Sequence, residues 1–439
     1  MSSTNNVKVT IGGPETTLGT AESRAYVVPI SGLPTLKRAA EKAEDPVIVG
    51  RNMAAGDFTM ASPVGGELPL SPRPCGGFGQ IMAGLLGDDL ATPVEIGACI
   101  RVMYTGGEDS CDITVVDTDD SEAISAEFGT LGAEEDDDNF GTEGSYDLTN
   151  ASSDTVGELV TLIDDDTGYT CEKVWGADSV DTATPVAITH SQAKNKWVYI
   201  FFGAADTGAY LHKFTAGLTS TERDSWSFQV DGMQTNQLFS GCKVDSLSLS
   251  AALKGMAEGS ANLLGTTFND DTISAASSLT LPDVDPMIFA NGDCYFGATD
   301  FSSKIQDLSL EIANNHGADG YGQGSTDRVK LYKGKFEASG SLSATLDSAT
   351  YALKDGVIDN DRYALSFYFY GQVIADAVRE FLLVEMPYVL LSNADDSDNS
   401  GIIDVSFDFK AVNPPGSYNY DDALTVYMVT TDDGTYTPS

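Results

Sequence analysis

Three histidines and six cysteines are the side chains of this 439-residue sequence with the strongest capacity for catalysis or metal binding. His190, His212 and His316 lack the H-x-x-x-H or H-E-x-x-H spacing that places two imidazoles on one helical face. No two cysteines form a C-x-x-C pair, so neither a zinc ribbon nor a thioredoxin-like site is supported. We expect six reduced and mostly buried thiols, at Cys75, Cys99, Cys111, Cys171, Cys242 and Cys294.

Glycine and serine motifs give no anchor for chemistry either. No serine lies in a G-x-S-x-G elbow, which one large class of hydrolases requires. Gly320–Gly324 and Gly76–Gly79 resemble phosphate-binding loops, but neither completes G-x-x-x-x-G-K-[ST] or G-x-G-x-x-G. We predict flexible turns at both positions.

Two acidic segments are candidates for cation binding. Asp396-Ser-Asp-Asn-Ser-Gly401 begins like a calcium loop, but its twelfth position is Phe407, where an EF-hand requires a bidentate glutamate. This segment predicts a polar hairpin tip, with an adventitious cation among Asp395, Asp396 and Asp398 as the alternative. The run Glu134–Asp138 is more typical of a solvated loop than of a metal site.

The remaining candidates concern carbohydrate chemistry. With 66 carboxylates in the chain, a glycosidase pair has no diagnostic signature. Trp175, Trp197 and Trp226 favour aromatic core packing over a sugar-binding platform. The sequence therefore nominates no catalytic residue, no cofactor and no metal ligand.

The composition is strongly acidic. Asp and Glu number 66 against 24 Lys and Arg, which gives a net charge of −42 and a pI near 4.1. This balance excludes binding to nucleic acid through overall charge, because phosphate attraction requires clusters of Lys and Arg. Apolar runs such as Trp197–Gly203 fall far short of the roughly 20 residues of a membrane span. Residues 1–6 lack the basic and apolar regions of an export signal, so we expect no Sec-type export.

Strand patterns dominate the chain. Alternation over Ile403–Lys410 predicts that Ile403, Val405, Phe407 and Phe409 are buried, with Asp404, Ser406, Asp408 and Lys410 in water. Over Asp245–Leu253, the buried side would carry Leu247, Leu249, Ala251 and Leu253. Trp197–Gly203 and Leu365–Tyr370 are richer in aromatic residues and are predicted to be buried on both faces. The expected class is mainly β, a sandwich or barrel with few helices.

A duplication is visible in the second half of the sequence. Phe239–Leu249 is similar to Phe301–Leu310, and each is followed by a similar second segment, Lys254–Leu263 and Lys333–Leu342. The second copy has a longer connection at Ala313–Val329. Two copies indicate a duplicated hairpin, and the two units could pack face to face or side by side.

Helices are expected at two places. Thr155–Ile163 places Val156, Leu159, Val160 and Ile163 on one face, with Ser153 or Asp154 as the N-cap. Phe78–Leu86 is the other helix, which ends at Gly87. Strands are expected at Asp112–Val116, Ala123–Phe128, Tyr169–Val174 and, after Asn413–Gly416, at Leu424–Thr430.

These elements predict four regions. Residues 1–105 form an extended N-terminal arm and the first part of a β-sandwich, and residues 190–412 form its remainder with the duplicated hairpins. Residues 106–189 form an inserted acidic α+β domain, since surface loops tolerate insertions. Residues 413–439 form a C-terminal arm or an extra strand.

Several segments together resemble the tail tube (major tail) protein of long-tailed bacteriophages and related tailed viruses. They cover roughly residues 7–105 and 190–412 and include Gly13–Thr20, Ser31–Pro34, Gly50–Leu70, Leu85–Gly87, the duplicated units, Met386–Leu390 and Ile402–Lys410. The resemblance implies a tail-tube-type β-sandwich with a short flanking helix and the inserted domain.

The same resemblance implies a function. Such subunits form rings, typically hexameric, that are assembled in the host cytoplasm and stack into a tube through which viral DNA leaves the head. It implies contacts with tape measure and tail terminator proteins, and no cofactor, enzyme activity or membrane. The N-terminal arm, the Ala313–Val329 loop and the C-terminal segment would join rings, and the insert would project outwards. We expect acidic side chains to outnumber basic ones along the channel, because Lys and Arg would hold the duplex.

Two other functions remain open from the sequence alone. One is a non-enzymatic surface-layer or adhesive protein whose acidic loops bind cations. The other is a secreted polysaccharide-active enzyme of β-sandwich type, which would need a cleft with two positioned carboxylates. Rings or tubes seen by electron microscopy would favour the tail protein over both.

Overall fold

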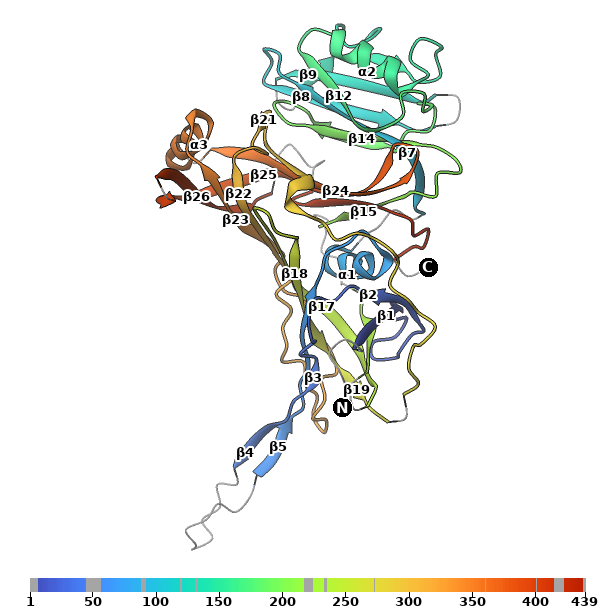
Figure 1. Ribbon diagram of the computed structural model, residues 1–439, viewed down its shortest axis with the longest axis vertical. Coiled ribbons are helices and arrows are strands. Elements are labelled where there is room, and N and C mark those ends of the chain that lie inside the picture. The colour runs from blue at the N-terminus through green and yellow to red at the C-terminus, as the bar shows by residue number, and fades with distance from the viewer. Residues whose placement is uncertain are drawn as a thin grey trace, which may run out of the picture.

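The computed structural model describes residues 7–44, 57–87, 92–118, 121–130, 133–216, 224–232, 235–271, 273–359, 361–399, 401–413 and 422–436. It is 53% strand and 9% helix, which confirms the mainly β class. Figure 1 shows an elongated molecule with a thin hairpin at one end, a sandwich in the middle and an α/β module at the other end.

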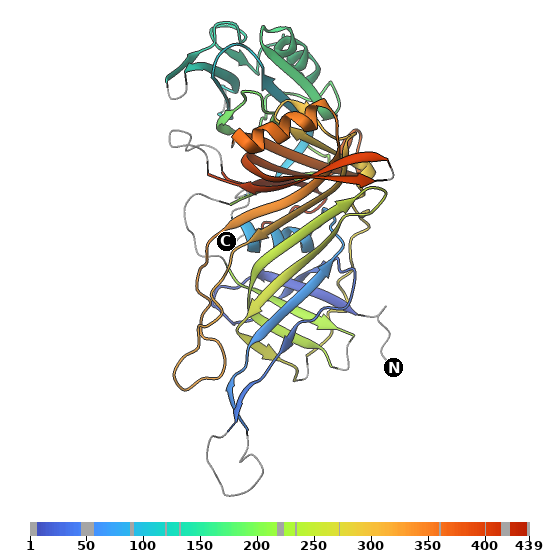
Figure 2. The same cartoon turned by 90° about the vertical axis from the view of Figure 1, so that its left-hand side faces the viewer.

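One long antiparallel sheet forms the body (Figure 2). Its neighbouring strands, in spatial order, are β6 (Val64–Leu70), β18 (Glu258–Gly265), β17 (Gln237–Ala252), β22 (Ile305–Ala313), β23 (Glu337–Thr345), β26 (Ile402–Ala411) and β25 (Val378–Asn399). The duplicated units are the hairpins β17–β18 and β22–β23. They lie side by side, with Leu249 opposite Leu310, so the face-to-face alternative does not apply.

Further strands extend this sheet or pack as a second layer. They are β1 (Lys8–Pro14), β2 (Arg24–Val28), β3 (Lys37–Arg38), β15 (Tyr210–Thr215), β16 (Trp226–Asp231), β19 (Thr267–Asn269), β20 (Gly292–Phe296), β21 (Thr299–Asp300), β24 (Arg362–Ala375) and β27 (Thr425–Thr430), with a 3-10 turn, η2 (Phe289–Asn291). β27 confirms the strand expected at Leu424–Thr430; Pro414–Gly416 before it lie outside the described residues.

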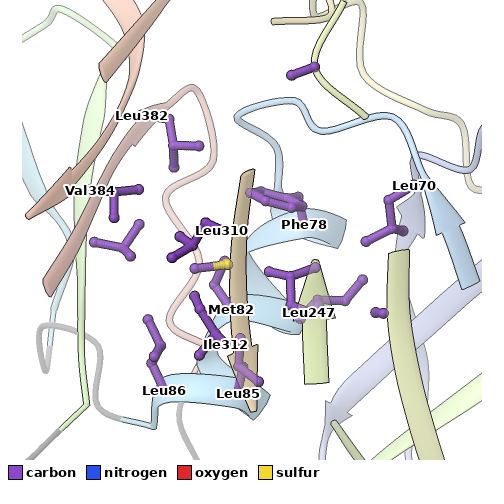
Figure 3. Close-up of a cluster of buried hydrophobic side chains, with 14 of the residues drawn as sticks. Leu70, Phe78, Met82, Leu85, Leu86, Leu247, Leu310, Ile312, Leu382 and Val384 are labelled. Atoms are coloured by element: carbon purple, nitrogen blue, oxygen red, sulfur yellow. The ribbon is translucent and has the colours of Figure 1, made fainter. Parts of the chain in front are cut away.

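A helix fills the centre of the body. α1 (Gly76–Leu86) begins two residues before the predicted Phe78, and all of its residues are buried. Figure 3 shows Phe78, Met82 and Leu85 of this helix among Leu247, Leu310 and Ile312 of the sheet and Leu382 and Val384 of β25. This contact buries the apolar face of the sheet, and burial of apolar surface is the main driving force of folding.

The flexible turn predicted at Gly76–Gly79 is wrong, because these residues form the first turn of α1. The glycines serve close packing: a Cβ on Gly77 would lie 2.1 Å from the carbonyl oxygen of Val27, and one on Gly79 would lie 2.4 Å from the Tyr436 ring. Backbone and a buried ring have little room to move.

We expect Gly77→Ala to destabilise the protein by about 3 kcal/mol, because the added methyl group must displace α1 from β2. Thermal unfolding would measure the loss. Gly107→Ala is the matched control, since its Cβ would meet no atom within 4 Å. Equal stability of the two variants would contradict the close-packing explanation.

The alternation predicted for β26 holds in its second half only. Val405, Phe407 and Phe409 are buried, but Ile403 is 50% exposed and Asp404 is 3% exposed, which is the reverse of the prediction. Ile403 lies beyond the core near the hairpin tip, and Gln306 covers Asp404 by donating to its Oδ1 at 2.8 Å. Leu253, also predicted to be buried, is 54% exposed because β17 ends at Ala252.

The upper module contains two sheets and one helix, which share a hydrophobic core. Its inner sheet contains β7 (Val94–Tyr104), β12 (Tyr169–Gly176) and β14 (Val198–Gly203); its outer sheet contains β8 (Ser110–Val116), β9 (Ala123–Thr130), β10 (Ala133–Asp136), β11 (Ser145–Asp147) and β13 (Ile188–Gln192). α2 (Val156–Asp165) confirms the predicted helix, but its N-cap is Thr155, not Ser153 or Asp154.

β7 and β14 belong to two cores at once. Ile100 and Ile200 face the module, with Leu159 of α2, whereas Cys99 and Phe201 face the body. β14 is buried along its whole length, which confirms the prediction for Trp197–Gly203. The module therefore shares strands with the body.

Two elements project from the body. The hairpin of β4 (Glu41–Glu44) and β5 (Asp57–Ala61) extends from one end (Figure 1). α3 (Ser348–Asp359) lies at the other end of the sheet, against β25.

Candidate functional surfaces

The described histidine side chains, which were candidates for catalysis or metal binding, do not lie together. His212 is fully buried, stacks on Tyr436 with ring centroids 4.5 Å apart, and places Nε2 2.9 Å from the carbonyl oxygen of Asp432. His316 lies in a different part of the body, after β22, and the side chain of His190 lies outside the described residues. His212 thus acts in packing.

All six cysteines are buried and unpaired with one another, which confirms the prediction. Burial raises the pKa of the Cys75 thiol to about 11 and that of Cys111 to about 12, so both remain protonated at neutral pH. The three tryptophans are at most 5% exposed, which confirms core packing over a sugar platform.

The acidic tip and the glycine-rich loop are structural. Asp398 Oδ1 accepts a hydrogen bond from Gly401 N at 2.7 Å in the β25–β26 hairpin, as predicted for a polar tip. Asp396 pairs with Lys354 Nζ at 2.6 Å. Gly320–Gly324 contains the predicted turn. Within the described ranges, no three acidic, His or Cys side chains are grouped to hold a metal ion, and no helix is long and apolar enough to cross a membrane.

Arg101 fastens the module to the body. Its guanidinium lies 4.3 Å from the ring centroid of Trp197 and 4.4 Å from that of Tyr295, and its Nε lies 3.0 Å from Glu172 Oε2. Cation–π contacts are strengthened when they are shielded from water, as Arg101 is at 8% exposure. The cluster is a structural clamp that joins β7, β12 and β20 with Trp197, the residue before β14.

Glu380 of β25 is a fully buried carboxylate, and no base among the described residues forms a salt bridge with it. Its Oε1 accepts from Gln372 Nε2 at 3.1 Å, while Oε2 has no hydrogen-bond partner among the described residues. Desolvation, with a smaller effect of the nearby Asp285 charge, raises the pKa of this carboxyl from 4.5 to about 7. The folded state therefore holds this proton more tightly than the unfolded state does.

This difference predicts a pH dependence. Below about pH 4.5 the group is protonated in both states; as the pH rises toward about 7, the unfolded state ionises first and the folded protein loses stability. We expect Glu380→Gln to raise the unfolding free energy by about 2 kcal/mol at about pH 8 and to change it little at about pH 4. Denaturant unfolding at both pH values tests this, with Glu311→Gln, on an exposed carboxylate, as the control. An equal gain at both pH values would contradict it.

The solvent face of the main sheet carries rows of small polar side chains. The rows begin at β6, β18 and β17 and run toward β25, through residues that face one another across the strands. They are Pro69, Ser260, Ser248, Glu311, Ser339 and Lys410; then Glu258, Ser250, Ser309, Ser341, Asp408 and Ser392; then Ala252, Asp307, Ser343, Ser406 and Asp395. We call this surface the serine face.

The serine face is rich in acidic side chains. Glu258, Asp307, Glu311, Asp395 and Asp408 supply carboxylates, all exposed. Lys410 is the one base in these rows, and its Nζ lies 3.1 Å from Oε1 of Glu337. Ser309 and Ser341 hydrogen-bond to each other at 2.8 Å, so part of the hydroxyl content is satisfied within the sheet. The serine face therefore carries a net negative charge.

The β4–β5 hairpin is a second candidate surface, which the sequence analysis missed. Phe58 is 61% exposed and Met60 is 64% exposed. An isolated two-stranded hairpin is marginally stable in water, and large exposed apolar side chains mark an interaction site. The apolar alternation of Phe58 and Met60 was the available signal. Ser62 N donates to the carbonyl of Thr326 at 2.7 Å, which ties the hairpin base to the 313–329 loop.

Fold and surfaces together define a class: a β-sandwich subunit with a polar sheet face and a projecting hairpin. Comparison with protein families gives a match over residues 4–411 to the family described as phage tail tube protein. The chain therefore belongs to the phage tail tube family, which confirms the resemblance. No curated protein matches it. Membership makes the chain a structural component of the virion tail that assembles with other tail subunits, and it implies a non-enzymatic role.

Proposed function

We propose that this subunit forms closed rings with copies of itself, and that the stacked rings form the conduit for DNA ejection. The observation that carries this proposal is the serine face. A sheet surface of this length with small polar residues at facing positions suits a wall past which a polyanion moves.

Charge supports placing the serine face toward the channel. Duplex DNA binds protein mainly by releasing counterions as Lys and Arg meet phosphates, and such contacts oppose sliding. The serine face offers exposed Asp307 and Glu311, whereas Lys410 is occupied by Glu337. An acidic wall repels the duplex and keeps water between the two surfaces.

Axial contacts are assigned to the projecting segments. The hairpin β4–β5 and the 313–329 loop leave the body together, and we propose that they reach the next ring. The strands β1 and β2 and the C-terminal Tyr436 already make contacts within the subunit. Any inter-ring role of the N-terminal and C-terminal segments is then secondary.

The inserted acidic domain, residues 106–189, is proposed to lie on the outside of the tube. Its core is continuous with β7 and β14, and the Arg101 clamp holds it to the body. In that position it leaves the channel open. Rings of hexameric type, contacts with tape measure and terminator proteins, and assembly in the host cytoplasm belong to the same proposal.

Electron microscopy of purified protein tests the function. We expect rings or tubes with an axial hole whose lining, in a reconstruction, is the serine face. Dispersed monomers under all assembly conditions would overturn the proposal. Polymers that form only with calcium would favour the surface-layer alternative, and release of sugar from a polysaccharide would establish the enzyme.

A further inference from the structure

The end of the main sheet farthest from the hairpin carries an exposed amphipathic surface on α3. Thr350 and Leu353 are buried against the body, yet Tyr351 is 57% exposed and Ile358 is 82% exposed on the outer side. Asp355 and Asp359 are also exposed, and the spacing of these four residues places them on one helical face. We call Tyr351, Asp355, Ile358 and Asp359 the α3 surface.

A segment of the projecting end has the complementary charge, whereas the hairpin strands themselves carry the exposed Glu41, Glu44 and Asp57. Residues 329–335 contain Lys330, Lys333 and Lys335 and no acidic residue, in a chain of net charge −42. Val329 and Tyr332 in this segment are each 51% exposed. The loop is fixed beside the hairpin base, because Arg38 Nη2 lies 2.8 Å from Asp327 Oδ1.

We call Phe58, Met60, Val329, Lys330, Tyr332 and Lys333 the arm surface. Both views place the β4–β5 hairpin and α3 at opposite ends of the main sheet (Figures 1 and 2). Two different surfaces at opposite ends form a heterologous contact, which builds an open-ended stack.

We propose that the arm surface of one copy docks on the α3 surface of a copy in the next ring. This inference rests on the proposed function and names the acceptor of the projecting arm. Apolar side chains on both surfaces would exclude water at the centre, and lysines facing aspartates would fix the direction of stacking. The partner that docks on the α3 surface is thus a second copy of this chain, and its charge and apolar character both match that surface.

Two double variants test the contact. We expect the arm variant Phe58→Ser/Tyr332→Ser and the α3 variant Tyr351→Ser/Ile358→Ser each to form rings that stack roughly tenfold less than wild type. Mixed together, the two should give pairs of rings that do not elongate, because each variant retains one intact surface. Val116→Ser, at an exposed apolar residue of the upper module, is the matched control and should give full-length tubes.

A charge exchange sharpens the test. Asp355→Lys/Asp359→Lys should stop stacking, and addition of Lys330→Glu/Lys333→Glu in the same chain should restore it. Electron microscopy and sedimentation give both readouts, and thermal unfolding verifies that each variant is folded. Rings of the α3 variant that stack as wild type, or an α3 variant that folds but forms no rings, would overturn this contact alone. Wild-type protein that never forms rings would overturn the proposed function instead.

Discussion

Glu15→Ala protein is expected to lose about 3–5 kcal/mol of folding free energy, one of the largest effects of any single substitution in this chain. Glu15 is 7% exposed and accepts hydrogen bonds from the hydroxyls of Ser225 and Ser227 at 2.8 and 2.6 Å. It also accepts from the backbone of Gly19 at 2.9 Å and of Gly241 at 2.8 Å. Alanine would leave these four donors, three of which belong to buried residues, without this acceptor.

The loss should extend to the whole N-terminal layer. Glu15 directly follows β1, and its contacts join β1 to β16 and β17, so the carboxylate closes a junction of three strands. Denaturant unfolding followed by tryptophan fluorescence measures the change, because Trp226 lies in β16. Glu15→Gln, which retains one carbonyl acceptor, should lose less. Glu258→Ala, on an exposed strand position, is the control; a Glu15→Ala protein as stable as this control would contradict the assigned role.

Local patterns predicted those elements in which local preference and tertiary packing agree. Apolar spacing placed α2, and strict alternation placed the buried Phe407 and Phe409 of β26. The same alternation failed at Ile403, because strand pattern alone does not show where the covering layer ends. Burial depends on that layer.

Glycine was the second source of error. In isolation, Gly76–Gly79 has high backbone entropy and indicates a turn. In the folded protein the absent side chains let α1 lie directly against Val27 and Tyr436. That packing joins residues that are far apart in sequence, and no local pattern contains it.

The serine face was also beyond the reach of sequence patterns, although each strand was visible. Ser248 and Ser309 are assigned to one surface only when β17 and β22 are known to be neighbours and their register is known. The duplication suggested a shared architecture but left the packing of the two units open. Register between distant strands is set by the whole core, which explains why the elements were predictable and the surface was not.

The serine face also supports the second large prediction, which concerns DNA. We expect tubes of a Ser248→Lys/Ser309→Lys/Ser341→Lys variant to retain duplex DNA that wild-type tubes release. Each lysine that meets a phosphate releases a counterion, so retention should fall steeply between about 50 and 200 mM salt. The positions are half-buried or exposed on neighbouring strands, so the long lysine side chains can extend into solvent without disturbing the core.

Cosedimentation of duplex DNA with assembled tubes over this salt range measures retention. Thr149→Lys/Ser152→Lys/Thr161→Lys adds the same charge to exposed positions of the upper module and is the matched control. If the serine face lines the channel, the first variant should slow DNA ejection from virions while the second leaves its rate unchanged, even where both bind free DNA. Equal ejection rates for the two variants would place the serine face away from the path of the DNA, since position inside the tube is the only property in which the two sets of lysines are designed to differ.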